Sequence, residues 1–548
     1  MQLQADARLC LGAVIGFVVL YLFGWSVYLL NLPPAIFRLL IPMAVLATLW
    51  RRGQLMALLK VPAVRQLAFS WVIVASWCLG LLALIRNYSG GEWVSDWFEH
   101  YHRTLFFLNR LPLDTRFLNM YPLPARPPLA NVVLGDFLAV TSSTFAHYQI
   151  FTTLLSSLAF FPLALLARCF CRASTRDPAA FLAILLMLNP MFVQNATFAW
   201  TKLPAAFFVL SGLYFSVDAT RAQSRTISFC VALCLSAALL THYSAAPYLL
   251  AFSVIWFWRM RQEVSPTSWM RSRIPAISIA AALLATWFAW ALFHYGRVTI
   301  SATTTFGAYE RLTAVQQVIR RGVNFFNLVV PHPLRPAEYS YLTQDSALGL
   351  WRDHFFNLYQ SNLLFAFGSG GMVVLAVLLW RHRKRAISPW GCFVAIVLFL
   401  NAAVISWPDR WGSAHIGLQP LILIGLTWIA AAMPELGPKL RCCLIGGLAV
   451  DTALGIALHF YFQHMDLALD FPNYRDQTLI HLRGYATWVN YVTKAAQHLT
   501  FLGDRSIQAA PLCTVLALLL ALAIYQANSA CPATDRVPTS SGSEAGLE

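Results

Sequence analysis

Long apolar runs alternate with short polar connections along almost the whole chain. The first run, from Leu9 to Leu30, is long enough to cross the roughly 30 Å hydrocarbon core of a bilayer, which takes about 20 helical residues. It is too long for the apolar part of a signal peptide, so we predict a retained helix. We predict membrane spans at residues 9–30, 35–50, 67–85, 147–167, 178–194, 201–217, 227–242, 244–258, 275–294, 362–380, 389–406, 414–432, 442–460 and 509–526.

This pattern predicts an all-α fold: a polytopic membrane helical bundle of about 14 spans (roughly 12–14), with outer-side loops and interfacial helices. The apolar run at 131–140 is too short to cross a bilayer, so we expect it to lie at the interface. The predicted units are an extra N-terminal helical hairpin at 1–66, a transmembrane core at 67–460, an outer loop with the last span at 461–526, and a disordered cytoplasmic tail at 527–548.

Clusters of lysine and arginine set the predicted orientation. They lie at Arg51, Arg52, Lys60 and Arg65; Arg168, Arg172 and Arg176; Arg221 and Arg225; Arg259, Arg261, Arg271 and Arg273; Arg381, Arg383, Lys384 and Arg385; and Lys439 and Arg441. If the predicted spans alternate in direction, all six clusters fall on one face, which is cytoplasmic by the positive-inside rule. Both termini are then cytoplasmic, and the loops at 86–146, 296–361 and 461–508 lie outside, which predicts a multi-pass plasma (inner) membrane protein with a periplasmic active site.

Composition agrees with a membrane protein. The 548 residues are 58% hydrophobic and only 11% charged, whereas soluble domains carry about 25% charged residues. The net charge of +16 does not indicate nucleic-acid binding, because the basic residues lie between apolar runs and set topology. The 11 cysteines form no disulfide framework and no paired zinc motif. No metal or other cofactor is indicated.

The first outer loop carries most of the chemistry. Within residues 86–129 it gathers carboxylates, histidines, arginines, tyrosines and tryptophans, while most of the chain is apolar. Two segments stand out. Asp96 to Tyr101 is acidic and aromatic, and Tyr121 to Leu129 combines tyrosine, prolines and Arg126. A membrane protein with such a cluster beside its spans uses it for binding or chemistry.

With the segments Asn189–Asn195 and Leu240–Ala245, these motifs resemble the GT-C superfamily of polyprenyl-phosphate-sugar-dependent glycosyltransferases. The resemblance is to the bacterial branch related to protein O-mannosyltransferases and aminoarabinose transferases, and it covers about residues 67–260. The chain departs from the family in three ways. The acidic motif follows the third predicted span instead of the first. Asp96 and Glu99 are three residues apart instead of adjacent. Arg126 and His242 stand where the family often has lysine.

The resemblance implies transfer of a sugar from a polyprenyl-phosphate donor to a hydroxyl acceptor, which is a lipid, glycan or protein, on the outer face. Such a reaction needs a carboxylate to take the proton of the attacking hydroxyl. It also needs a cation, for which arginine is well suited, to stabilise the leaving phosphate. Asp96 is the candidate base and Glu99 the second candidate, because a spacing of three places both on one helix face. The candidate substrate-binding residues are Tyr101, Arg103, Tyr121, Arg126, Lys202 and His242.

Each candidate also has a structural interpretation. Asp96 suits a solvated helix cap, Arg126 and Lys202 suit interfacial cations, and His242 suits a structural histidine. Asp451 lies within a predicted span, where we expect an internal hydrogen bond instead of catalysis. Aromatic and charged residues at Pro331–Tyr339, Trp351–His354 and Trp407–Trp411 suit either sugar binding or an interfacial aromatic belt.

Two other functions remain open. A transporter or flippase of a lipid-linked saccharide would carry paired charges inside several spans and related halves, and the chain shows few such charges and no clear halves. An O-antigen polymerase or ligase usually carries its main loop late in the chain, whereas the richest loop here comes early. In all three cases the partners are a polyprenyl-phosphate-linked sugar or saccharide, its acceptor and the lipid bilayer, without nucleic acid.

Overall fold

The structure is a computed structural model. It describes residues 3–86, 88, 96–118, 121–171, 177–219, 225–262, 266–302, 312–331, 334, 355–356, 358–360, 362–382, 389–405, 417–461, 499–505 and 509–529. In these ranges the chain is mainly helical and contains no β-strand, so the predicted all-α membrane fold is confirmed. One isolated bridge pairs Phe117 with Tyr121.

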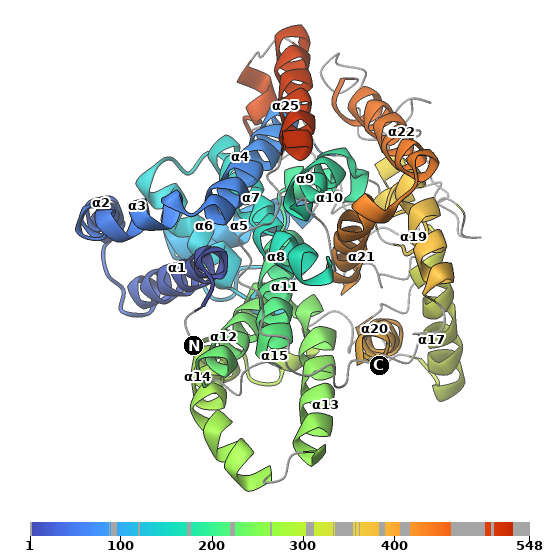
Figure 1. The fold of residues 1–548 in the computed structure, drawn as a ribbon. Coiled ribbons are helices and arrows are strands. Elements are labelled where there is room, and N and C mark those ends of the chain that lie inside the picture. The colour runs from blue at the N-terminus through green and yellow to red at the C-terminus, as the bar shows by residue number, and fades with distance from the viewer. Residues whose placement is uncertain are drawn as a thin grey trace, which may run out of the picture.

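The helices of the first half of the chain pack together around the middle of the molecule, except for α2 (Leu40–Trp50) and α3 (Arg52–Lys60), which lie at its edge (Figure 1). The others are α1 (Ala5–Leu29), α4 (Pro62–Leu82), α5 (Asp96–Asn109), α6 (Leu129–Val140), α7 (Phe145–Ser157), α8 (Phe160–Phe170), α9 (Pro178–Leu188), α10 (Pro190–Thr197), α11 (Lys202–Ala219) and α12 (Arg225–Thr241).

The second half supplies helices around this group (Figure 1). They are α13 (Ala246–Gln262), α14 (Pro266–Tyr295), α15 (Val298–Ser301), α17 (Ala314–Val329), α19 (Ser369–Arg381), α20 (Pro389–Leu400), α21 (Gln419–Ala432), α22 (Pro438–Gly455) and α25 (Ala509–Ser529). Short 3-10 and π-helical segments lie between the helices of both halves or at their ends. They are η1 (Pro34–Leu39), η3 (Leu123–Ala125), η4 (Tyr243–Ala245), η8 (Asn401–Ile405), η10 (Met433–Glu435), η11 (Ile456–Tyr461) and η13 (Leu502–Arg505).

The structure does not confirm the predicted number of spans. Six helices in the described ranges are long and apolar enough to cross a membrane. Two bent pairs, α2 with α3 at 67° and α9 with α10 at 73°, raise that number to eight. The predicted count of about 14 is not confirmed, because several apolar runs form helices of only 10–17 residues, such as Lys202–Val217 and Thr226–Thr241. The hydropathy of a run shows that its side chains avoid water. It does not show whether the helix crosses the bilayer, because helices inside a bundle are as apolar as those that face lipid.

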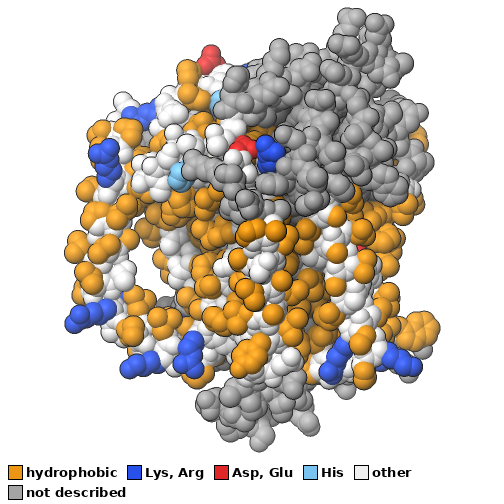
Figure 2. All heavy atoms as spheres, turned by 90° about the horizontal axis from the view of Figure 1, so that it is seen from above, with side chains coloured by type: hydrophobic (Ala, Val, Ile, Leu, Met, Phe, Trp, Pro, Cys, Tyr) orange, Lys and Arg blue, Asp and Glu red, His pale blue; other side chains and the backbone are white. Residues whose placement is uncertain are grey.

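The N-terminal segment divides into two parts. Helix α1 packs into the bundle, where Tyr21 hydrogen-bonds Thr286 at 2.8 Å and the Phe17 ring meets Phe207 and Phe208 edge-on. Helices α2 and α3 contain no buried residue and lie at one edge of the molecule (Figure 1). Hydrophobic side chains cover much of the face in Figure 2, with several lysine and arginine side chains at its margins, as expected for a surface in lipid.

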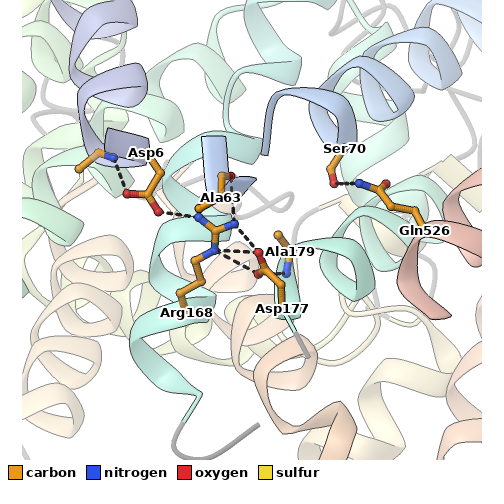
Figure 3. A network of polar contacts seen from close by, with 8 residues as sticks. Asp6, Ala63, Ser70, Arg168, Asp177, Ala179 and Gln526 are labelled. Carbon is orange, nitrogen blue, oxygen red and sulfur yellow. Dashed lines mark hydrogen bonds and ion pairs between the residues drawn. The ribbon is translucent and has the colours of Figure 1, made fainter. Parts of the chain in front are cut away.

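A buried ion-pair network joins the ends of three helices (Figure 3). Arg168, in the last turn of α8, contacts Asp6 in the first turn of α1 at 2.5 Å and also pairs with Asp177. Asp177 caps α9 by accepting a hydrogen bond from the backbone N–H of Ala179 at 3.0 Å. The Arg168 cation is thereby satisfied within the protein and fixes α1, α8 and α9 to one another. Arg172, Arg176, Arg221 and Arg383 to Arg385 of the predicted basic clusters lie outside the described residues.

Candidate functional site

The site is built on α5, which places four polar residues on one side. Asp96, Glu99, His100 and Arg103 are spaced at i, i+3, i+4 and i+7, and positions with this spacing share one face of a helix. The two carboxylates lie in the first turn, where the helix dipole favours negative charge. The helix ends at Asn109, just before Arg110 adopts a left-handed backbone with φ of 52°.

Glu99 lies between two arginines. Its Oε1 is 2.7 Å from Arg103 Nη2, and its Oε2 is 3.4 Å from Arg126 Nη2. The Glu99 side chain is fully buried, so this carboxylate is committed to balancing the two cations. That arrangement suits a positioning role for Glu99, since a general base must offer an oxygen to the acceptor hydroxyl.

Arg103 holds the loop that carries Arg126. Its Nη1 and Nη2 donate hydrogen bonds to the carbonyls of Leu123 at 2.7 Å and Pro122 at 3.1 Å. Its Nε donates to Glu99 at 2.8 Å, and its guanidinium covers the Phe117 ring at 4.1 Å. These contacts engage all three guanidinium nitrogens, so Arg103 fixes the loop to α5 and has few N–H groups free for a ligand.

Arg126 is the more available arginine. Its side chain is 17% exposed, against 1% for Arg103. Apart from Glu99, its contacts are a long 3.4 Å hydrogen bond from Nη1 to the Ala125 carbonyl and the Tyr121 ring, 5.7 Å from the guanidinium carbon. Its Nε has no hydrogen-bond partner among the described residues. A buried N–H of this kind favours an anionic ligand at the same place.

Asp96 faces two cations from other elements. Burial raises the pKa of the Asp96 carboxyl, the positive charges of Lys202 and Arg126 oppose this rise, and the negative charge of Glu99 adds to it. Lys202 begins α11, and its Nζ lies 3.3 Å from the centroid of the Trp200 ring. Asp96 is partly exposed, unlike Glu99. Of the two carboxylates, Asp96 is therefore the one that an acceptor can reach.

Two neutral histidines complete this group. The pKa values of His100 and His242 lie well below the ordinary value, first because of burial and then because of the neighbouring positive charge of Arg126. The Nδ1 of His242 accepts a hydrogen bond from the Ser244 backbone N–H at 3.1 Å. His100 was not among the candidates from the sequence, although its i+4 spacing from Asp96 would have placed it on the same face.

Tyr101 lies apart from this group. Its hydroxyl donates a hydrogen bond to the Ser143 carbonyl at 2.6 Å, and its ring packs against Phe145 and Tyr148. The structure thus brings together seven of the predicted candidates and turns one toward α7. The seven are Asp96, Glu99, Arg103, Tyr121, Arg126, Lys202 and His242.

Asp451, predicted to form an internal hydrogen bond, forms several. It accepts one from the Tyr359 hydroxyl at 2.7 Å and one from the Ser369 backbone N–H at 2.7 Å, which caps α19. No group of three metal-ligating side chains occurs in the part of the chain that the structure describes. Of the later motifs, Trp351–His354 and Trp407–Trp411 lie outside the described residues, and only Pro331 and Leu334 of Pro331–Tyr339 lie within them.

Comparison with known proteins adds a similarity of fold. No protein-family model and no curated protein matches the chain. Similar solved structures include ArnT from Cupriavidus metallidurans bound to undecaprenyl phosphate, at 14% identity and a TM-score of 0.45. The apo state of the same ArnT is similar at 15% identity and a TM-score of 0.47. Each alignment covers 85% of this chain and 76% of the other.

Proposed function

We propose that this protein is a GT-C-type membrane glycosyltransferase. It transfers a sugar from a polyprenyl-phosphate donor to a hydroxyl acceptor on the outer, periplasmic face of the inner membrane. The observation that carries the proposal is one group of charges from three separate elements: Asp96 lies with Glu99 in the first turn of α5, Arg126 pairs with Glu99 at 3.4 Å, and the charge of Lys202 acts on Asp96. One site then holds a partly exposed carboxylate and two cations.

The charges of the group suit a lipid phosphate. Arg103, Arg126 and Lys202 are cationic, Glu99 is paired with two of them, and both histidines are neutral because their pKa values are lowered. The Arg126 guanidinium can bind two phosphate oxygens at once, and Lys202 adds a point charge. Burial strengthens these interactions because the local dielectric constant is low.

The proposed reaction is a displacement at the anomeric carbon. The acceptor oxygen attacks that carbon while its proton passes to the Asp96 carboxylate, and the bond from the anomeric carbon to the phosphate oxygen breaks. The bonding electrons leave with the polyprenyl phosphate, whose charge Arg126 and Lys202 stabilise. The raised pKa of Asp96 makes it a better proton acceptor than an exposed aspartate.

The location of the site supports an outer-face reaction. Asp96 and Arg126 lie in the segment between α4 and α7, which the predicted basic clusters assign to the outer side. Arg126 directly precedes Pro127 and Pro128, and apolar helix α6 follows, which supports a position of the guanidinium near lipid headgroups. A donor with its prenyl chain in the bilayer can therefore present its phosphate at this depth.

The test uses purified protein in nanodiscs with radiolabelled undecaprenyl-phosphate sugars and a membrane extract as acceptor. Wild type and an Asp114→Asn variant, which alters an exposed carboxylate of the same loop, should transfer label to the extract. Asp96→Asn should lose transfer by about 10²-fold or more, as expected for removal of a general base. Full transfer by an Asp96→Asn, Glu99→Gln double variant would refute the assigned site. Donor binding without transfer by wild type would indicate a transporter.

A further inference from the structure

Three buried carboxamides form a second polar site, distinct from the ionic group around Asp96. They are Asn195 in α10, Gln360 in the helical segment 358–360, and Gln419, the first residue of α21. Each of these three residues is at most 1% exposed. Residues from three distant parts of the sequence therefore place uncharged donors and acceptors at one point in the interior.

The hydrogen bonds fix the orientation of all three amides. Asn195 Nδ2 donates to the Met191 backbone carbonyl at 2.7 Å, so this atom is the nitrogen. The same Nδ2 donates to Gln360 Oε1 at 3.2 Å, and Asn195 Oδ1 accepts from Gln419 Nε2 at 2.5 Å. A flip of Gln360 would bring two N–H groups face to face, and a flip of Gln419 would bring two oxygens face to face. The backbone contact therefore sets the polarity of the whole chain of amides.

Two ends of this chain of amides are unused. Gln360 Nε2 and Gln419 Oε1 are buried and have no hydrogen-bond partner within the described ranges of the structure. An unpaired polar atom in the interior is costly, and native proteins bury few of them. The fixed orientation means that one end presents N–H donors and the other a carbonyl acceptor. A ligand that complements them needs both an acceptor and a donor.

The backbone around the amides is irregular in the way that binding sites within membranes are. Helices α9 and α10 form one apolar segment that bends by 73°, and Asn195 lies in its second half. Next to α21, Asn401 begins the π-helical turn η8, and a Cβ at Gly417 would lie 1.6 Å from Asn401 Oδ1. Within a membrane, broken helices and π-turns are tolerated where they are buried in protein or line a polar cavity, and π-turns are frequent at functional sites.

A row of aromatic rings leads from the ionic group to this site. The Lys202 cation contacts the Trp200 ring, whose centroid is 4.6 Å from that of Phe198. The Phe198 ring is 5.7 Å from the Phe356 ring, and Phe356 is four residues before Gln360 in the sequence. The two sites are thus joined through packed side chains.

We propose that the Asn195–Gln360–Gln419 amides bind the hydroxyl groups of a saccharide, which belongs either to the donor sugar or to a glycan acceptor. A hydroxyl is both donor and acceptor, and can therefore satisfy Gln360 Nε2 and Gln419 Oε1. The three amides carry no charge, so they complement a neutral ligand. This inference rests on the proposed transferase function and names the substrate part that a second subsite would recognise.

The test compares ligands with and without a sugar. Wild type, Gln360→Met and Gln419→Met would be titrated in nanodiscs with undecaprenyl phosphate and with undecaprenyl-phosphate-linked glucose, mannose and arabinose. The sugar-bearing ligand that wild type prefers should bind each variant about tenfold or more weakly, because a buried hydrogen bond is lost. Undecaprenyl phosphate should bind all three proteins equally. That result would assign the amides to the donor sugar.

If donor binding is unchanged but both variants raise KM for the acceptor in membrane extract by about tenfold, the amides belong to the acceptor saccharide. Unchanged donor affinity and unchanged acceptor KM would overturn the proposal, as would an equal loss of affinity for undecaprenyl phosphate itself. Absence of undecaprenyl phosphate binding by wild type would instead contradict the proposed function. Methyl glycosides of the three sugars would then test the amide site alone.

A matched control separates binding from folding. Asn362 is a buried amide two residues from Gln360, and its Oδ1 already accepts hydrogen bonds from the backbone N–H groups of Leu364 and Phe365. Asn362→Ala should lower the thermal unfolding midpoint without changing the ratio of affinities for sugar-bearing and sugar-free ligand. Gln360→Met should change that ratio, even if its unfolding midpoint also falls.

Discussion

Arg103 follows Glu99 by one turn of α5, and the two form a fully buried ion pair with 2.7 Å between Nη2 and Oε1. Without Arg103, the buried Glu99 carboxylate keeps only the longer 3.4 Å contact to Arg126, and breaking a buried ion pair costs about 3–5 kcal/mol. We therefore expect Arg103→Met to lower the free energy of unfolding in detergent by about this amount. The loop at Pro122 and Leu123 also loses its anchor.

A double-mutant cycle isolates the pair. The Glu99→Gln, Arg103→Met double variant should be less destabilised than the sum of the two single variants, because the second change removes the unbalanced charge. Strict additivity would show that the two residues do not act as a pair. Both variants that carry Glu99→Gln also lose the ion pair between Arg126 and Glu99 Oε2. This loss cancels from the coupling energy when the loop that carries Arg126 keeps its position.

The pH dependence of sugar transfer should report Asp96. A general base acts in its ionised form, so activity is present above the pKa of Asp96 and is lost as pH falls through it. Lys202 lowers this pKa by its positive charge. Lys202→Met should therefore move the acidic limb of the kcat/KM profile to higher pH. The control is Lys60→Met, at the exposed end of α3, which should leave the limb in place. An acidic limb that is unchanged or moves to lower pH in Lys202→Met would show that Asp96 is not the base.

The sequence predicted much of the ionic group because its signals are local. Spacing along α5 placed Asp96, Glu99 and Arg103 within two turns, and the prolines after Arg126 marked a loop beside a helix. The direction of the Tyr101 side chain had no such signal, because it depends on how α7 packs against α5. His100 could have been found by its spacing from Asp96 alone.

Features that depend on distant contacts were not predictable. The amides of Asn195, Gln360 and Gln419 are separated by long stretches of sequence, and nothing in their local patterns marks them as neighbours. The predicted span count is not confirmed for a related reason. Apolar composition is the same for a helix that crosses the bilayer and for a shorter one packed inside the bundle, so helix length had to come from the structure.

Asp451 should act in folding and not in catalysis. Its carboxylate caps α19 through the Ser369 N–H and accepts a hydrogen bond from the Tyr359 hydroxyl. Asp451→Ala removes a cap and leaves a buried hydroxyl unpaired, so we expect a loss of about 2–4 kcal/mol in stability. Asp451→Asn keeps an acceptor oxygen and should lose less. Transfer activity per folded molecule should be unchanged in both, and a selective loss of kcat in Asp451→Asn would contradict the structural role.

Contact between α1 and α6 should control the position of Arg126. A Cβ on Gly24 of α1 would lie 2.2 Å from Asp136 Oδ1 and 2.8 Å from Val132 Cγ1, and both of these residues are on α6. Gly24→Ala must displace the Asp136 and Val132 side chains, which we expect to press on α6 and to cost about 1–3 kcal/mol, as overpacking does in tight cores. Gly16→Ala, on the same helix with open space around it, should be neutral or stabilising by up to about 1 kcal/mol.

The same pair of variants tests whether the fold positions the site. Helix α6 begins at Leu129, only three residues after Arg126, so a shift of α6 moves the guanidinium relative to Asp96. A small misplacement of this kind weakens both phosphate binding and the reaction. Gly24→Ala should therefore bind undecaprenyl phosphate more weakly at a temperature where it is still folded, while Gly16→Ala binds as wild type does. Equal affinity for all three proteins would show that Arg126 keeps its place independently of α1.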